Sequence, residues 1–247
     1  KSRKMEEVDR EITAYHEAGH TVVAAKLENT DRPHKVTIVP RGRALGSTMI
    51  LPEKESYHMQ KKRLKNQLAV LFGGRIAEDM FCGDISAGAS DDIKRATDLA
   101  RAMVSELGMS AKIGPINYAE RQGSDFLGTE LMASRFHSEE TTREIDEEIK
   151  LLLKEAYELA EGVLDKHREE IMQLVVALMR FETLSGVEID RLLDGVPVDE
   201  LRTEEELTEP APIEVPGATE QPSSNEEVPN SDGLTGELPG EPGLSPA

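Results

Sequence analysis

The stretch TAYHEAGH, residues 13–20, lies near the start of this 247-residue chain and carries the pattern His-Glu-x-x-His. Apolar residues recur around it at three- and four-residue steps over about residues 6–28, which predicts one long helix. Because residues four apart share a helix face, His16 and His20 can both bind one zinc ion. Glu17 lies one step round the helix, where it can accept a proton from zinc-bound water. The pattern therefore predicts two metal ligands and a general base within one helical turn.

The same pattern has two other interpretations: chance placement on a solvated helix face, and a structural zinc site. Structural sites are usually closed by four protein ligands and have no use for a glutamate at this offset. Ala18 and Gly19 are small, which is expected if this helix packs closely under a metal ion. We therefore favour a catalytic site, which needs a third protein ligand.

The third ligand must come from a distant part of the chain. Val23 and Lys26 occupy the positions at which a metzincin would carry glycine and histidine, so that extended pattern is absent. Four histidines are candidates that we interpret as structural or solvated: His34, His58, His137 and His167. Two carboxylates are better candidates, Glu78 on a predicted buried helix face and Asp92 in the first turn of another helix. Spacing alone does not choose between these two.

The rest of the chain predicts a mainly helical fold with a small sheet. Two short β-branched and apolar runs, residues 35–39 and 45–51, are separated by a proline and a glycine and predict a pair of strands. Helical periodicity predicts further helices over residues 58–81, 91–107, 138–163, 171–181 and 187–193.

Local signals refine these elements. Ser90 is the predicted N-cap of the helix over 91–107. The pair Gly73-Gly74 predicts a kink or a tight contact within its helix. Residues 110–135 contain several glycines and predict a long surface loop. Beyond about residue 204 the chain is rich in Pro, Glu, Gly and Ser without apolar periodicity, which predicts a disordered acidic tail.

Composition excludes several classes of protein. The net charge of −19 argues against a nucleic-acid binder, because neutralising phosphates requires clustered Lys and Arg. Cys82 is the single cysteine, so neither an internal disulfide nor a zinc site of two or four cysteines can form within the chain. No run approaches the roughly 18–20 apolar residues that span a bilayer. The chain begins without an initiator methionine and already close to its strongest motif, from which we expect further sequence upstream.

Several short motifs occur in order along the chain. They are TAYHEAGH (13–20), IVPRG (38–42), LG (45–46), FGGRIAE (72–78), GASDDI (88–93), AT (96–97) and LGM (107–109). In this order and at these intervals, residues from about 8 to 195 resemble the peptidase domain of the FtsH family of membrane-anchored, ATP-dependent zinc metalloproteases. The series is far more specific than the His-Glu-x-x-His pattern by itself.

The resemblance implies roles for particular residues. Asp92 would be the third ligand of one zinc ion per chain, and Glu78 would orient a ligating histidine. The strand at 45–51 would be an exposed edge to which an extended substrate adds by main-chain hydrogen bonds. The candidate substrate contacts are Gly46, Ser47, Thr48 and Met49. An ordinary packed hairpin is the other interpretation of this strand.

The resemblance also implies the organisation of the protein. We expect a mainly α, zincin-like peptidase domain over 1–203, with a catalytic part at about 8–135 that holds the small sheet. A C-terminal helical bundle follows at about 138–195, and its apolar faces could serve ring contacts or, as we favour, mostly the core. No G-x-x-x-x-G-K-[ST] phosphate loop is present, so an AAA ATPase module and transmembrane segments are expected upstream. The implied assembly is a homo-hexameric ring on the cytoplasmic face of the bacterial inner membrane.

The predicted function is a zinc-dependent endopeptidase domain of an ATP-dependent processive protease that degrades unfolded or membrane proteins. Glu17 would activate water held by the two histidines and Asp92. A rival hypothesis is a catalytically silent scaffold that only forms the ring of an AAA ATPase, although such a scaffold would not need Glu17 and Asp92. A third hypothesis is a zincin of unrelated fold, in which Glu78 binds the metal.

Overall fold

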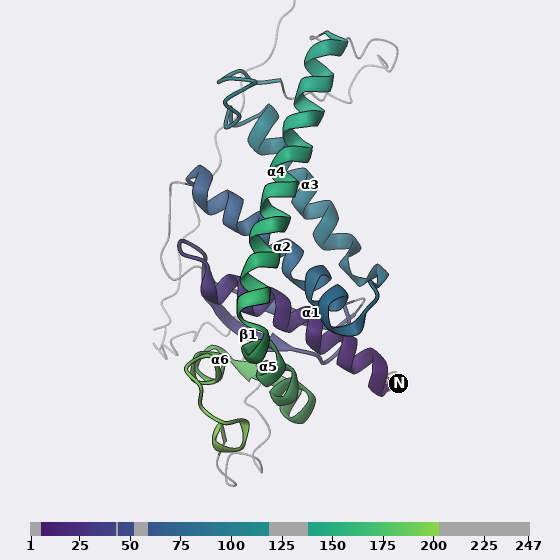
Figure 1. Ribbon diagram of the computed structural model, residues 1–247, viewed down its shortest axis with the longest axis vertical. Coiled ribbons are helices and arrows are strands. Elements are labelled where there is room, and N and C mark those ends of the chain that lie inside the picture. Colours follow the sequence, from purple (N-terminus) through teal and green to yellow (C-terminus); the bar gives the residue numbers. More distant parts are fainter. Residues whose placement is uncertain (1–5, 43, 52–58, 119–137, 203–247) are drawn as a thin grey trace, which may run out of the picture.

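The computed structural model describes residues 6–42, 44–51, 59–118 and 138–202, and the predicted fold of helices with a small sheet is confirmed (Figure 1). The helices are α1 (Glu7–Lys26), α2 (Lys61–Cys82), α3 (Ser90–Ser105), α4 (Glu139–Lys166), α5 (Arg168–Phe181) and α6 (Gly186–Leu193). The strands are β1 (Pro33–Thr37), β2 (Ser47–Ile50) and β3 (Thr183–Ser185), and the 3-10 helices are η1 (Ala87–Ala89) and η2 (Val198–Glu200).

Some predictions fall outside the described residues. They concern the tail over 204–247, most of the loop over 110–135, and the histidines His58 and His137. Among the helices that the structure describes, none combines the length and the apolar character needed to traverse a bilayer.

Helices α1 and α2 form the centre of the fold, and their backbones touch where they cross. A Cβ atom added at Gly19 would lie 2.7 Å from the Cβ of Ala77 and still closer to the carbonyl oxygen of Gly73. A Cβ added at Gly73 would lie 2.7 Å from the carbonyl oxygen of Gly19. Helix α2 runs unbroken through Gly73-Gly74, so this pair marks a tight contact between helices and not a break in the helix.

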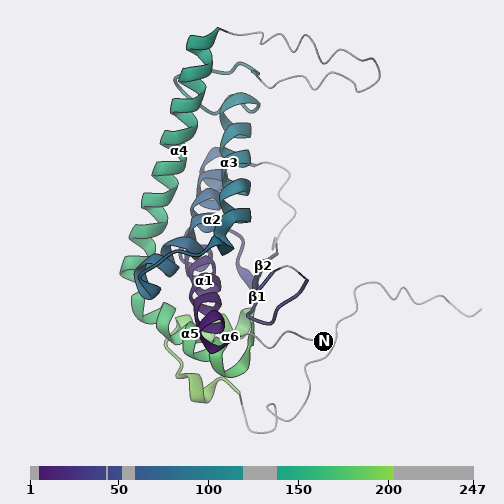
Figure 2. The ribbon, with the colours of Figure 1, turned by 90° about the vertical axis from the view of Figure 1, so that its right-hand side faces the viewer.

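Helix α4 is the longest element, with 28 residues, and covers α2 and α3 (Figures 1 and 2). Its first turn is capped by Ser138, whose hydroxyl oxygen accepts the backbone N–H of Thr141 at 3.2 Å. One face of α4 is buried at helical spacing, through Ile145, Ile149, Leu152, Ala156, Ala160 and Leu164. Helix α5 packs on α1. The apolar residues of the C-terminal helices are therefore mainly part of a core shared with the N-terminal half.

The sheet lies on the other side of α1 and α2 from α4 (Figure 2). Its strand order is β2-β1-β3, with both pairs antiparallel. The three residues of β3, between α5 and α6, were not predicted as a strand because the run is too short to show alternation. Pairing with β1 attaches the C-terminal helices to the N-terminal half. Strand β2 is left at an edge of the sheet in the part of the chain that the structure describes.

The predicted N-cap of α3 is wrong. Ser90 is already the first residue of α3, and the capping position is occupied by Ala89, whose side chain makes no cap. The chain enters α3 through η1, and the side chain of Ser86 caps that turn by accepting the N–H of Gly88 at 3.0 Å. The capping serine thus lies four residues earlier than the sequence pattern indicated, because a 3-10 turn precedes the α-helix.

The crossing of α1 and α2 predicts opposite effects for two glycine-to-alanine changes. Gly19→Ala should lower the free energy of unfolding by about 1–3 kcal/mol or more, because the new methyl group meets backbone that cannot move alone. Gly162→Ala in α4 is the matched control. Nothing lies within 4 Å of its added Cβ, so the higher helix propensity of alanine should stabilise by up to about 1 kcal/mol. Urea unfolding measures both, and equal effects of the two changes would contradict the tight crossing.

Candidate metal centre

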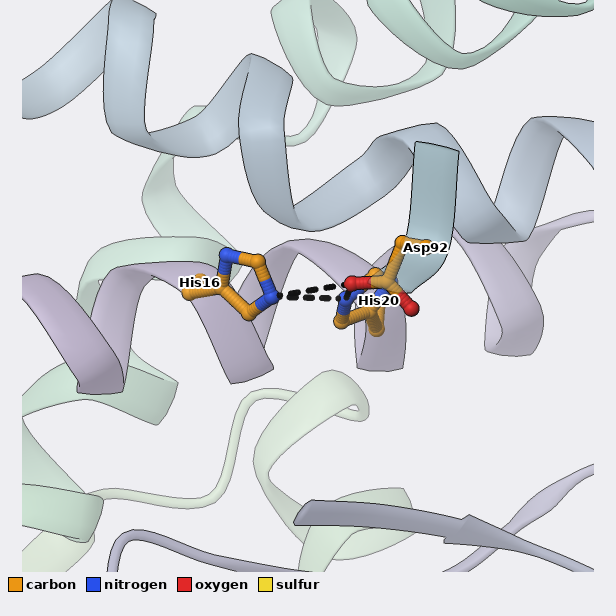
Figure 3. A group of neighbouring side chains, drawn as sticks. All are labelled: His16, His20 and Asp92. Atoms are coloured by element: carbon orange, nitrogen blue, oxygen red, sulfur yellow. Dashed lines mark hydrogen bonds and ion pairs between the residues drawn. The ribbon is translucent and has the colours of Figure 1, made fainter. Parts of the chain in front are cut away.

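Three side chains from two helices converge at one point. His16 and His20 lie one turn apart on α1, and Asp92 approaches from the first turn of α3 (Figure 3). The two imidazole Nε2 atoms are 3.0 Å apart, and Oδ2 of Asp92 lies 3.4 Å from each of them. In the described part of the chain, this is the one group of three possible metal ligands whose donor atoms lie this close together.

Hydrogen bonds at Nδ1 determine which nitrogen of each histidine carries its proton. Nδ1 of His20 lies 2.7 Å from the carbonyl oxygen of Val70, which can only accept, so this nitrogen must donate. Nδ1 of His16 lies 2.7 Å from Oε1 of Glu78, a carboxylate that likewise accepts. In the neutral imidazoles both lone pairs are therefore on Nε2 and face each other and Asp92. Two lone pairs and a carboxylate at such short range attract a cation.

The distances fit a zinc ion. Tetrahedral coordination with zinc–ligand bonds of about 2.0–2.1 Å separates neighbouring ligand atoms by about 3.3 Å. The observed separations are 3.0 and 3.4 Å. Three protein ligands, two nitrogens and one oxygen, leave one tetrahedral position for water or substrate, as in catalytic sites. The donor set and the geometry thus match a catalytic zinc site.

Glu78 lies behind His16, on the Nδ1 side of the ring and away from the point of convergence. It is 1% exposed, and its carboxylate also accepts hydrogen bonds from the backbone N–H of Ser86 at 2.6 Å and from the Ser86 hydroxyl at 3.1 Å. Burial raises the pKa of Glu78, but the hydrogen bonds from His16 and Ser86 outweigh this and lower it. An ionised Glu78 keeps the His16 ring in a fixed tautomer and orientation.

The charges around the point of convergence favour a positive ion there. Burial lowers the pKa of His16, but hydrogen bonds with Asp92 and Glu78 and the nearby charge of Glu17 outweigh it and raise the pKa to about 9. Burial raises the pKa of Asp92, but hydrogen bonds with the two histidines outweigh it and hold that pKa well below its usual range. Without a metal, a proton on His16 occupies the place that a metal ion would take.

The floor of the site is the backbone of α2. A Cβ atom at Gly74 would lie 2.6 Å from Cε1 of His16 and 2.6 Å from Nε2 of His20. Ala18 and Gly19 were expected to be small because this helix packs closely under a metal ion; the close packing at Gly19 is present, but it does not lie under the imidazoles. Gly19 faces the backbone of α2, and Gly74 is the residue whose missing side chain leaves space for the imidazoles.

Glu17 is buried beside β2. Its Oε2 accepts a hydrogen bond from the hydroxyl of Thr48 at 2.6 Å. A Cβ at Gly46 would lie 2.7 Å from Oε1 of Glu17, so this carboxylate fits only because residue 46 has no side chain. On the same edge strand, the neighbours of Thr48, Ser47 and Met49, are exposed. Two of the four predicted substrate contacts therefore touch Glu17.

Other sequence candidates lie elsewhere. His34 is exposed on β1, and Nδ1 of His167 lies 2.9 Å from Oε1 of Glu170 at the junction of α4 and α5. Sequence reasoning missed the carbonyl of Val70 and the roles of Ser86. Val70 lies four residues before Gly74, on the face of α2 that meets α1, and this position could have indicated the contact between its carbonyl and His20. Nothing in the local sequence indicated the hydrogen bonds that Ser86 makes.

Comparison with known sequences identifies the relatives of this chain. The sequence model of Peptidase family M41 matches residues 3–192. The protein named ATP-dependent zinc metalloprotease FtsH 2 of Methylacidiphilum infernorum is 43% identical over 245 residues, which make up 98% of this chain and 38% of that relative. FtsH 1 of Thermoanaerobacter sp. is 45% identical over 199 residues, 81% of this chain and 33% of that protein.

A third relative, ATP-dependent zinc metalloprotease FtsH of Rubrobacter xylanophilus, is 44% identical over 200 residues, 81% of this chain and 31% of the relative. The chain thus spans roughly a third of the length of these proteins. The family match covers most of the chain, and it includes both histidines of the His-Glu-x-x-His pattern and Asp92. This chain therefore belongs to Peptidase family M41 and is a peptidase domain of the FtsH type.

Proposed function

We propose that this chain is a zinc-dependent endopeptidase domain, in which the two histidines and Asp92 hold one zinc ion and Glu17 is the general base. This proposal rests on the convergence of three donor atoms: the two Nε2 atoms lie 3.0 Å apart, and Oδ2 of Asp92 lies 3.4 Å from Nε2 of His16. Both Nδ1 atoms are hydrogen-bonded to acceptors, so the Nε2 lone pairs are free to bind a metal. The names of the relatives, which are zinc metalloproteases, support it. A zinc ion at this point supplies Lewis acidity, which lowers the pKa of a coordinated water and polarises a peptide carbonyl.

The side chains of the protein perform the proton transfers. The Glu17 carboxylate takes a proton from the attacking water and later gives it to the amine nitrogen of the leaving peptide. Glu78 keeps the His16 lone pair directed at the metal, and the Val70 carbonyl does the same for His20. Burial of Glu17 beside the sheet excludes bulk water from most of its surface.

Strand β2 is the proposed substrate platform. It forms an edge of the described sheet, and Ser47 and Met49 are exposed on it. An extended peptide that pairs with this edge gains main-chain hydrogen bonds whatever its side chains are, which suits a protease of low sequence specificity. Thr48 touches Glu17, so a peptide on this strand lies next to the general base.

The rival hypothesis of a silent scaffold is not favoured. A domain that only forms a ring has no need of a buried carboxylate beside two histidines or of Ser86 and Glu78 behind them. The hypothesis that Glu78 binds the metal is also not favoured, because Glu78 lies on the Nδ1 side of His16 while both Nε2 atoms face Asp92.

For the longer protein we propose the organisation that the family resemblance implies. An AAA ATPase module would unfold and deliver polypeptides, transmembrane segments would anchor the protein in the bacterial inner membrane, and six chains would form a ring. The names of the relatives support the dependence on ATP.

Removal of one carboxylate should weaken zinc binding strongly, while removal of its neighbour should not. Asp92→Ala should weaken zinc binding by more than about 100-fold, which exceeds the effect typical of residues outside the ligand set. The matched control is Asp91→Ala, which removes an exposed carboxylate from the same helical turn and should leave zinc binding unchanged. Titration with a competing chelator measures both. Equal zinc affinity in the two variants would contradict the proposed ligand set.

Glu17→Gln should separate zinc binding from catalysis. The variant should retain about one zinc per chain but cleave an unstructured fluorogenic peptide about 10²–10⁴-fold more slowly, because the amide cannot accept the proton. The measurements are zinc content by atomic absorption and initial cleavage rates, with a chelator-treated wild-type chain as the second reference. Full activity in Glu17→Gln would reject the mechanism.

Zinc affinity should rise with pH. The pKa of His16 is raised to about 9 in the metal-free site, so at pH 7 its Nε2 carries a proton that zinc must replace. We expect release of about one proton per zinc at pH 7. We also expect an apparent affinity that increases about tenfold per pH unit up to pH 9 and then levels off. Calorimetry in buffers of different ionisation enthalpy measures the proton release, and a pH-independent affinity would contradict this account.

A further inference from the structure

We propose that Thr48 is a positioning residue for Glu17: its hydroxyl holds one oxygen of the carboxylate, so that the other oxygen is left to take the proton. This inference rests on the proposed function, because it assigns a purpose to the contact between β2 and the general base. The proposal also gives the side chains and the main chain of β2 different roles. The side chain of Thr48 serves Glu17, and the main chain of β2 serves the substrate.

The hydrogen-bond geometry assigns the single hydroxyl proton of Thr48. Its Oγ1 lies 2.6 Å from Oε2 of Glu17, 3.2 Å from the backbone oxygen of Glu17 and 3.5 Å from the hydroxyl of Thr21. A distance near 2.6 Å is typical of a hydroxyl that donates to an ionised carboxylate. The Thr21 hydroxyl donates to the Glu17 backbone oxygen at 2.7 Å and so already satisfies that acceptor. The Thr48 proton therefore belongs to the carboxylate.

The position of Thr48 on β2 makes this contact rigid. Side chains alternate along a strand, so Thr48 faces α1 while Ser47 and Met49 are exposed on the opposite side. The strand itself is held by pairing with β1, where Thr48 lies opposite Val36. The carboxylate is thus held by an element that does not belong to its own helix.

Gly46 confines the same carboxylate from a second direction. A Cβ at this position would lie 2.7 Å from Oε1 and 2.8 Å from Cγ of Glu17. The segment 46–48 therefore brings its backbone close to one oxygen of the Glu17 carboxylate and a hydrogen-bond donor to the other. With both in place the base is oriented before substrate arrives, and such preorganisation is what catalytic groups require.

The test compares two substitutions of Thr48 in the full zinc-loaded chain, with an unstructured fluorogenic peptide as substrate. Thr48→Val keeps the shape but removes the hydroxyl, and should lower kcat about tenfold to hundredfold with KM within about twofold and zinc content unchanged. Thr48→Ser restores the hydroxyl and should recover kcat to within about threefold. In a Glu17→Gln background, Thr48→Val should cause little further loss, because residues that act as a unit are not additive.

The control for general loss of a hydroxyl is Thr142→Val. Thr142 donates to the backbone of Ser138 at 3.2 Å at the start of α4, so its replacement tests a hydrogen-bonded threonine that does not contact Glu17. Its kcat should equal that of the wild type. A Thr48→Val enzyme with unchanged kcat, or a Thr48→Ser enzyme as slow as Thr48→Val, would overturn the proposal.

A second measurement does not depend on activity. Urea unfolding of the zinc-free chain in a double-mutant cycle tests whether Thr48 and Glu17 interact. Thr48→Val should lower the urea midpoint more in the chain with Glu17 than in the Glu17→Ala chain, and additive effects would overturn the proposed contact. If the wild-type chain binds zinc but cleaves no peptide, the proposed function fails, while this cycle still decides whether Thr48 holds Glu17.

Discussion

The contact between the backbones of α1 and α2 at Gly19 and Gly73 is the constraint on which the whole site depends. It brings α2 close enough for the carbonyl of Val70 to accept from one imidazole and for Glu78 to accept from the other. It also places Gly74 directly beneath both rings. A wider crossing would separate the histidines from the groups that orient them, and their lone pairs would no longer meet.

A second link connects Glu78, which orients His16, to Asp92 on α3. Ser86 gives both its backbone N–H and its hydroxyl to Glu78, and its hydroxyl oxygen caps η1, which leads into α3. The start of α3 is the turn that carries Asp92. Glu78 contacts Nδ1 of His16, and Asp92 faces its Nε2. Both carboxylates are therefore held by the segment that begins at Ser86, which couples the two sides of the imidazole ring.

Much of the architecture could be predicted from the sequence, and the exceptions have physical causes. The long periodic helices were predictable because each buries one face, and the spacing of His16 and His20 fixed them on a common side of α1. The choice between Glu78 and Asp92 was not predictable from spacing, because a distance in space between residues far apart in the chain depends on how α2 and α3 pack. Strand β3 was missed since its pairing with β1 comes from tertiary contact and not from any local pattern.

The reliance of this centre on missing side chains has a consequence for how inactive relatives arise. Gly74 and Gly46 lie against the imidazoles and against the carboxylate of Glu17, and an added methyl group at either position would force those side chains to move. Substitution of either glycine would disturb the arrangement of these side chains while the His-Glu-x-x-His pattern itself stayed intact. A classification of family members as active or inactive by that motif alone would count such proteins as active. The residues at the positions of Gly46 and Gly74 would be the more informative criterion.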